Sequence, residues 1–488
     1  MMKKILVVTA LIILSAILLS ACADLSPWQG DGLPPDGGGI VAPAPENDNG
    51  NDQGNQNDQP PDDDVLEGLF DRFPLHRDII ADFPEAFYPG YTMFFSAPSG
   101  SFFDSDLNRR HRVFENSLSD EWNAVRDKYS FIFPPRIMPT ATLRQQLNQQ
   151  HNEYSAQMEV AAIPVTHLAE WQGTVVVTGR TNRFFRSIQE LPGTDFSQPF
   201  FNLELMESLR VRNGMYAIVG DASRYQKNSV VLYFNTPALR AAGITEDLYA
   251  LVESGAWTWE VFGSMLARAN QYSDRQFVAG TTLRNQVAAA ALYNSFGQSL
   301  VTNTPDAPIN NFNAYESNHI IGQISAFFNA GVSFAESEQA ISAFYNGDLL
   351  FMIGRLGEVE FFDTAFDSWG FVPLPTAYVG QQRSAFLCPD LTTVFVVPRL
   401  LVTNQDAVGT FIQSINAVAQ YYMDIFSAAF MQDIAREAGA LRMFDLVQQN
   451  MFIEPAFVFG GANAALANGS YRALYDAVAR QVHDAPQS

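Results

Sequence analysis

The sequence predicts an α/β protein built from at least two lobes. About 420 residues remain once the N-terminal segment described below is set aside, which is more than one hydrophobic core usually holds. Short apolar runs alternate with amphipathic segments, at a spacing typical of strand–helix–strand units in parallel sheets. The hydrophobic content of 47% is that of an ordinary globular protein.

A first series of elements is expected between residues 91 and 163. Apolar runs predict strands over residues 91–95, 131–133 and 158–163, the second of them ended by Pro134 and Pro135. Helices are predicted over residues 106–129 and 141–154. The first helix places apolar residues on one face: Val113, Phe114, Leu118, Trp122 and Val125.

Two further series follow. The run at 230–234 predicts a strand, and the run at 392–397 predicts another that leads into long helices over residues 404–437. Between these strands the pattern predicts helices over residues 237–242, 245–254, 258–271, 285–296 and 318–329. No internal repeat is found in the sequence.

The N-terminus reads as a secretory signal. Lys3 and Lys4 precede an apolar run over residues 5–19, and small residues follow before Cys22. The layout resembles the bacterial lipobox, which implies cleavage after residue 21 and a lipid on the Cys22 thiol. The protein would then be anchored to the cell membrane on its extracytoplasmic face. A transmembrane helix is the alternative, but the run is short for a hydrocarbon core of about 30 Å.

Residues 22–66 predict a disordered acidic tether. Asp, Asn, Gln, Gly and Pro dominate this segment, and no Lys or Arg occurs between Lys4 and Arg72. The net charge of −23, more than half of it outside the tether, argues against a nucleic-acid partner.

Motifs for catalysis or metal binding are not found in the sequence. The six histidines are scattered, and there is no His-Glu-x-x-His pair, no Gly-x-Ser-x-Gly elbow and no P-loop. We therefore expect no catalytic residue, no metal and no cofactor, although a glycosidase pair of carboxylates stays open. Cys388 lies in an apolar stretch and is expected to pack as a small hydrophobe.

Six segments in order resemble motifs of bacterial extracellular solute-binding proteins of family 1. They lie between residues 195 and 398, and each is weak alone. The segments are DFSQPFF at 195–201, GMYAIVGD at 214–221, VLYFNTPAL at 231–239, GAWTWE at 255–260, FYNGDLLFM at 344–352 and WGFVPLP at 369–375. Residues 91–190 match the family poorly, and only their strand and helix order fits.

The resemblance implies a two-lobed, periplasmic-binding-protein-like type II fold with discontinuous lobes and an interlobe cleft. Lobe one is predicted to comprise residues 67–218 and 376–430, and lobe two residues 223–372 and 431–484. The chain would connect the lobes near residues 214–221 and 369–375. The family relation also implies a receptor that delivers a solute, expected to be a sugar or oligosaccharide, to the permease subunits of an ABC importer.

Candidate ligand-binding residues lie beside the predicted connections and strand ends. Flat aromatic rings and planar polar groups suit the apolar faces and hydroxyls of a sugar. The candidates are Asp221, Tyr233, Asn235, Trp257, Trp369, Arg355 and Trp171. Several alternatives stay open: a core position for Trp369, a turn or capping role for Asp221, a helix cap for Asn235, and a surface pair of Arg355 with Glu358.

Two other functional classes stay open. An extracellular carbohydrate-active hydrolase would need a carboxylate pair that no motif marks. A surface interaction or adhesion lipoprotein would be compatible with the acidic tether alone. The identity of the solute is not predicted, because proteins of one fold differ in their pocket residues.

Overall fold

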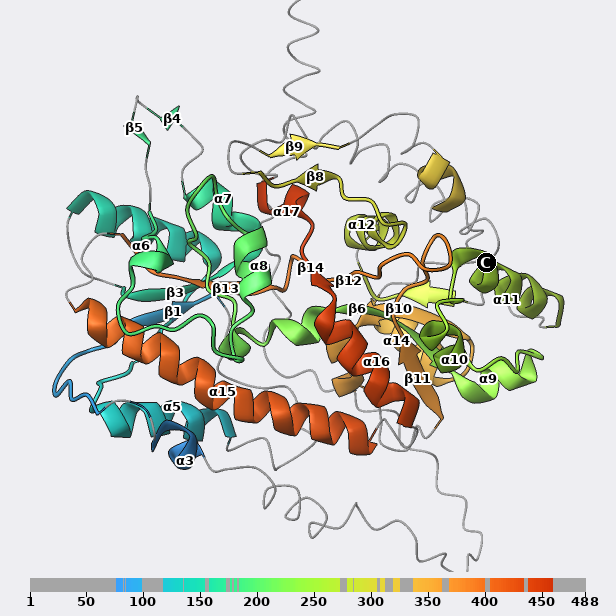
Figure 1. The fold of residues 1–488 in the computed structure, drawn as a ribbon, viewed down its shortest axis with the longest axis horizontal. Coiled ribbons are helices and arrows are strands. Elements are labelled where there is room, and N and C mark those ends of the chain that lie inside the picture. The colour runs from blue at the N-terminus through green and yellow to red at the C-terminus, as the bar shows by residue number, and fades with distance from the viewer. Residues whose placement is uncertain are drawn as a thin grey trace, which may run out of the picture. The chain divides into compact units, whose positions relative to one another are not determined.

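The elements belong to two four-stranded mixed sheets, each with its own hydrophobic core (Figure 1). The computed structural model describes residues 76–459 with internal gaps, the longest being residues 99–116 and 325–336. Cys22, the predicted signal and the predicted tether therefore lie outside the described residues, as do residues 106–116 of the helix predicted over residues 106–129.

The first sheet has the order β13-β3-β1-β2. Its strands are β1 (Phe95–Ala97), β2 (Arg136–Ile137), β3 (Val160–Pro164) and β13 (Thr393–Val396). β1 is parallel to both β2 and β3, whereas β13 is antiparallel to β3. The sheet therefore joins strands from two distant parts of the chain.

The second sheet has the order β11-β6-β10-β7. Its strands are β6 (Val230–Asn235), β7 (Ala279–Thr281), β10 (Phe351–Arg355) and β11 (Trp369–Val372). β10 is parallel to β7, but β6 is antiparallel to both of its neighbours. The sequence-based expectation of parallel sheets is therefore wrong for one strand of each sheet, because an apolar run carries no information about strand direction.

Helices cover each sheet. In the first core, the long α15 (Gln405–Asp433) contacts α3 (His76–Ala81) and α5 (Ser117–Tyr129), and Figure 1 shows α15 beside α5. α6 (Thr140–Glu153) contacts β1, and α7 (Leu168–Trp171) follows β3. α8 (Leu203–Ser208) contributes Leu205 and Met206 to the same core.

The second core is covered in the same way. α9 (Thr236–Ala241) contacts β6 and β11, and α14 (Ser337–Tyr345) contacts β10 and β7. The remaining helices of this core are α10 (Leu248–Glu253), α11 (Trp259–Tyr272), α12 (Asn285–Ser295) and α16 (Ala438–Gln449). α17 (Pro455–Phe459) instead contacts α7 and the 3₁₀ turn η3 (Val165–His167), on the side of the first core. The predicted lobe boundaries remain predictions.

Smaller elements complete the fold. Three further strand pairs are present. β12 (Ala385–Phe386) is parallel to β14 (Met451–Phe452). β4 (Val176–Val177) pairs with β5 (Arg180–Thr181), and β8 (Val301–Thr302) pairs with β9 (Ile309–Asn310). The latter two pairs are antiparallel. One further 3₁₀ turn, η4 (Ile188–Glu190), leads toward α8.

Two segments carry the chain between the sheets. The first connection, residues 219–229, holds the 3₁₀ turns η5 (Asp221–Ser223) and η6 (Tyr225–Asn228). The return connection, residues 373–392, leads from β11 to β13. Residues 373–375 of the predicted connection at 369–375 lie in this return connection, whereas Trp369–Val372 pairs with β6 as a strand of the second sheet.

Candidate functional site

The carboxyl ends of three strands of the second sheet meet beside the connections. Strands β7, β10 and β11 end at Thr281, Arg355 and Val372, and β6 runs the other way, so it begins at this edge. Leu356, which follows β10, donates its backbone amide to the carbonyl of Ser229 at 2.7 Å. This edge is the position where open α/β sheets bind ligands.

The carboxyl end of β3 in the first sheet lies against the return connection. Pro164, its last residue, pairs with Thr393, and the amide of Val165 donates to the carbonyl of Thr392 at 2.9 Å. The return connection therefore contacts the first sheet at residue 392 and the first connection at Leu387, which bridges to Ser229. We take this junction as the candidate site.

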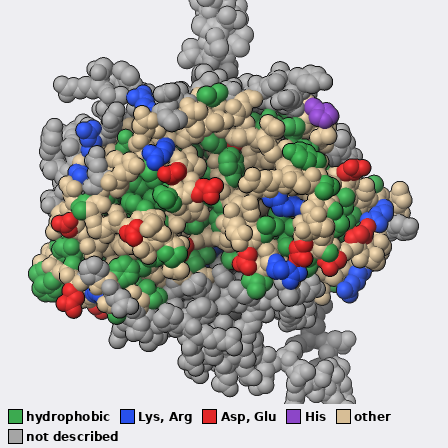
Figure 2. All heavy atoms as spheres, viewed as in Figure 1, with side chains coloured by type: hydrophobic (Ala, Val, Ile, Leu, Met, Phe, Trp, Pro, Cys, Tyr) green, Lys and Arg blue, Asp and Glu red, His purple; other side chains and the backbone are tan. Residues whose placement is uncertain are grey.

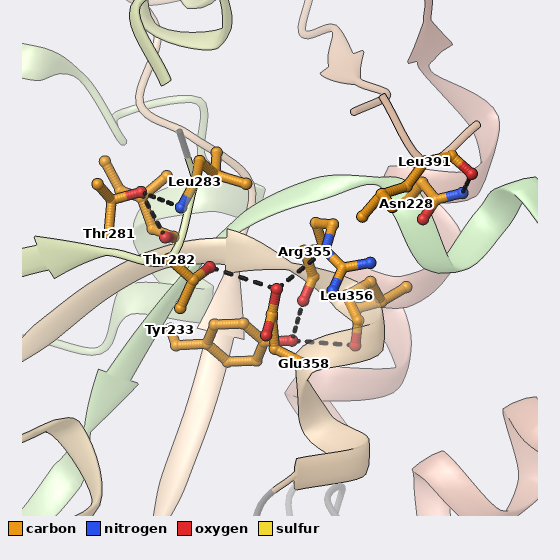
Figure 3. Close-up of polar contacts among 10 residues, drawn as sticks. Asn228, Tyr233, Thr281, Thr282, Leu283, Arg355, Leu356, Glu358 and Leu391 are labelled. Carbon is orange, nitrogen blue, oxygen red and sulfur yellow. Dashed lines mark hydrogen bonds and ion pairs between the residues drawn. The ribbon is translucent and has the colours of Figure 1, made fainter. Parts of the chain in front are cut away.

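Arg355 is the central polar residue at the edge of the second sheet (Figure 3). Its Nε donates to Oε1 of Glu358 at 2.9 Å, and the hydroxyl of Thr282 donates to the same oxygen at 3.3 Å. The hydroxyl of Tyr233 donates to the carbonyls of Arg355 at 2.7 Å and Leu356 at 3.0 Å. We call Arg355, Glu358, Thr282 and Tyr233 the Arg355 cluster.

The electrostatics of the cluster favour a charged guanidinium. Burial is the largest single influence and lowers the pKa of Arg355, but Glu358, Cys388 and Tyr233 together outweigh it, and the pKa of Arg355 is raised. The side chain of Glu358 is 6% exposed, whereas that of Arg355 is 22% exposed. The carboxylate is thus buried behind a guanidinium that reaches solvent.

Asn228 and Leu391 lie on the other side of Arg355 (Figure 3). The side-chain amide of Asn228 donates to the carbonyl of Leu391 at 3.1 Å, which joins the two connections. Leu391 is 51% exposed, so an apolar surface is accessible next to the polar cluster. A solute with both polar and apolar faces matches this combination.

Four of the predicted site residues gather around β6. Tyr233 is fully buried, and its ring lies 5.6 Å from that of Trp369. Trp369 pairs with Asn235, which ends β6. At about 3.3 Å per residue, Asn235 lies about 16 Å along the strand from Val230, where β6 begins. The prediction that the carboxyl end of β6 faces the connections is therefore wrong, because β6 is the reversed strand.

Asn235 and Arg355 adopt the alternative roles weighed from the sequence. The Asn235 side chain accepts from the amide of Ala238 at 3.0 Å and thus caps α9. Arg355 does pair with Glu358, but the pair is not a surface pair, because Glu358 is buried. The Arg355 role in ligand binding stays a prediction.

The other predicted residues lie elsewhere. Asp221 is buried in η5, accepts from the side chain of Gln226, and contributes with burial to a raised pKa of Tyr225. Trp257 is fully buried, and its indole donates to the carbonyl of Pro373 at 2.9 Å. Trp171 is also buried, with its ring stacked on His167. Trp257 and Trp171 offer no surface to a ligand in this conformation.

Sequence reasoning missed Thr282 and Asn228, and it considered Glu358 only as an alternative surface partner of Arg355. These residues lie in short turns after a strand or before one, where the sequence has no periodic pattern. Their position beside Arg355 depends on pairing between β7 and β10 and on contact between η6 and the 3₁₀ turn η7 (Leu356–Phe361). A polar residue directly after a buried strand is the signal that could have identified Thr282.

The described residues contain neither a metal-binding cluster nor a membrane-spanning helix. Among the described residues, no group of three or more His, Cys, Asp and Glu side chains is placed to hold a metal ion. Within the same residues, no helix combines the length and apolar character needed to cross a membrane. On the face drawn in Figure 2, acidic and basic side chains are interspersed, so neither sign of charge dominates that face.

Comparison with solved structures identifies the fold. The cyclic α-maltosyl-1,6-maltose binding protein of Arthrobacter globiformis superimposes with a TM-score of 0.55 and 13% identity, covering 82% of this chain and 99% of that chain. A probable secreted solute-binding lipoprotein of Streptomyces coelicolor gives a TM-score of 0.54 and 10% identity, covering 81% and 98%. This chain has the two-lobed fold of extracellular solute-binding proteins. The fold predicted from the family resemblance is confirmed.

A third solved structure agrees. The GacH receptor of Streptomyces glaucescens, solved unliganded and with acarbose, gives a TM-score of 0.50 and 12% identity, covering 81% of this chain and 100% of that chain. No protein-family model matches the chain, and no curated protein matches it. The likeness at these identities concerns the fold.

Proposed function

We propose that this protein is a solute-binding receptor that captures a carbohydrate at the junction of its two lobes. The fold carries the proposal, because it is shared over about four-fifths of the chain with a receptor for a cyclic maltosaccharide and with a receptor solved with acarbose. The Arg355 cluster supports it, since a fixed donor beside an exposed leucine suits a ring with hydroxyl and C–H faces.

The receptor performs no chemistry in this proposal. Specificity comes from contacts at the sheet edges, and hinge bending about the paired connections closes the lobes on the solute. The closed form delivers the solute to the permease subunits of an ABC importer. Cys22 carries a lipid that holds the receptor on the extracytoplasmic face of the cell membrane.

A binding screen tests the receptor role. The chain from residue 23 onward is purified and its melting temperature is measured with mono- and oligosaccharides. A true solute at 100 times its Kd should stabilise the folded state by about 2.7 kcal/mol. Product analysis of the same mixtures separates the alternatives, because turnover of a saccharide would indicate a hydrolase, and the absence of any binding or turnover would favour an adhesion protein.

Membrane fractionation tests the anchor. Full-length protein and its Cys22→Ser variant are expressed in a bacterial host, and their membrane-bound fractions are compared. We expect the variant to be released or left unprocessed, since stable anchoring needs two or more acyl chains. Equal membrane binding of both proteins, with no lipid on the mature N-terminus, would contradict the proposed anchor.

A further inference from the structure

We propose that the solute carries an oxyanion, a carboxylate or a phosphate, and that the terminal nitrogens of Arg355 receive it. This inference rests on the proposed receptor function and sharpens it from carbohydrate in general to an acidic carbohydrate. The chemistry that recognises such a group is a planar guanidinium with two parallel N–H donors.

The orientation of the guanidinium is fixed from behind. Glu358 accepts from Nε at 2.9 Å, and Thr282 holds the same carboxylate oxygen at 3.3 Å. The backbone of Arg355 is held by the Tyr233 hydroxyl at 2.7 Å. A donor that is positioned before the solute arrives loses little conformational entropy on binding.

The outer edge of the guanidinium is available. Its only hydrogen-bond partner among the described side chains is Glu358, which takes Nε and leaves the two terminal nitrogens without a partner in the described part of the chain. The side chain is 22% exposed, in contrast to the buried carboxylate. End-on binding through both terminal nitrogens is the geometry that matches carboxylate and phosphate oxygens.

A second basic residue, Lys227, has its backbone beside η7. The backbone and Cβ of Lys227 pack against Gly357, where an added methyl group would come within 3.2 Å of the Lys227 carbonyl. Lys227 and Arg355 thus flank the start of η7. Arg224 belongs to the same first connection as Lys227. Among the described carboxylates, buried Glu358 acts directly on Arg355, and Asp390 lies on the return connection near Cys388. Because Glu358 lies behind the guanidinium, an incoming anion meets the cation first.

Isothermal titration with matched saccharides tests the inference. The purified chain from residue 23 onward is titrated with trigalacturonate, glucose 6-phosphate and the neutral maltotriose. We expect trigalacturonate or glucose 6-phosphate to bind at least about tenfold more tightly than maltotriose, with an affinity that falls as salt is raised. Which of the two binds distinguishes a carboxylate from a phosphate solute.

Two variants assign the effect to the cluster. Arg355→Gln should weaken binding of the acidic ligand about tenfold or more, whereas the exposed control Arg268→Gln, whose partner is Glu246, should leave it unchanged. Glu358→Gln keeps an oxygen acceptor for Nε and removes the opposing charge. It should strengthen binding of the acidic ligand about tenfold, and it keeps the test valid if Arg355→Gln does not fold.

The outcomes separate this inference from the receptor role. Binding of maltotriose as tight as that of both acidic ligands would overturn the oxyanion inference and leave the receptor role intact. Acidic binding that is unchanged in Glu358→Gln and in a folded Arg355→Gln would also overturn it. The absence of binding by any saccharide in the wider screen would contradict the receptor role itself.

Discussion

The backbone amide of Cys388 donates a 2.8 Å hydrogen bond to the carbonyl oxygen of Asn228. This bond joins the two connections between the sheets, and the bridge between Ser229 and Leu387 extends the pairing. The two connections therefore form one paired strip rather than two independent linkers. Hinge motion between the lobes would have to bend both together.

The thiol of Cys388 should make stability depend on pH in the alkaline range. Burial raises its pKa from 9.0 to about 11, although nearby Arg355 opposes the shift. The folded state therefore keeps a proton that the unfolded chain has lost. The resulting stabilisation, about 2–3 kcal/mol, is complete below pH 9 and is lost as the pH rises from 9 to about 11.

Urea unfolding of wild type and Cys388→Ala at several pH values measures this effect. The difference in unfolding free energy between the two proteins should fall between pH 9 and 11. A difference that is constant across this range would show that the thiol titrates alike in the folded and unfolded states. Taking the difference between the unfolding free energies of the two proteins removes the contribution of Lys and Tyr side chains that titrate in the same range.

Glu454 should be important for stability. It is fully buried, and its carboxylate accepts hydrogen bonds from the amides of Leu300 and Val301, both at 3.0 Å, and from three further donors. Burial raises its pKa, and the donated bonds oppose that rise. Glu454→Gln places an NH2 group against N–H donors, so we expect a loss of about 2–4 kcal/mol.

Chemical denaturation checks the Glu454 prediction. Glu253→Gln is the matched control, because Glu253 forms an exposed ion pair with Arg442 and such pairs contribute about 0–1 kcal/mol. Equal, small losses in both variants would indicate that the donors around Glu454 find water instead.

Two helical glycines should respond to alanine in opposite directions. A Cβ at Gly409 in α15 would lie 1.7 Å from the carbonyl oxygen of Pro192, which is backbone and cannot rotate away. A Cβ at Gly263 in α11 meets no atom within 4 Å. We expect Gly409→Ala to lower the melting temperature and Gly263→Ala to stabilise by roughly 0.5–1 kcal/mol. Thermal unfolding of both variants measures these effects. An unchanged melting temperature in Gly409→Ala would contradict the packing argument.

The sequence was informative where burial follows from local composition. β6 and α12 lie within a residue of their predicted ranges, because each is a nearly continuous apolar run. Cys388 is buried, as expected. The direction of β6 was not predictable, since a run of apolar residues reads the same in either direction. The burial of Glu358 was not predictable either, because it depends on packing between η6 and η7, which no local pattern encodes.

Trp257 and Trp369, both at the second core, should separate folding from binding. Trp257 is fully buried, and its indole donates to the carbonyl of Pro373, so Trp257→Ala should cost about 3–5 kcal/mol. Trp369 is only partly buried and packs at the edge of the second core, 5.6 Å from the Tyr233 ring. Trp369→Ala should therefore cost less stability. Tyr233 contacts Trp369 and holds the backbone of Arg355. The Trp369→Ala variant should therefore weaken solute binding by its folded fraction more than the Trp257→Ala variant does. Melting temperatures and titration of folded protein measure both effects, and a sharp loss of stability in Trp369→Ala with intact affinity would place Trp369 in the core alone.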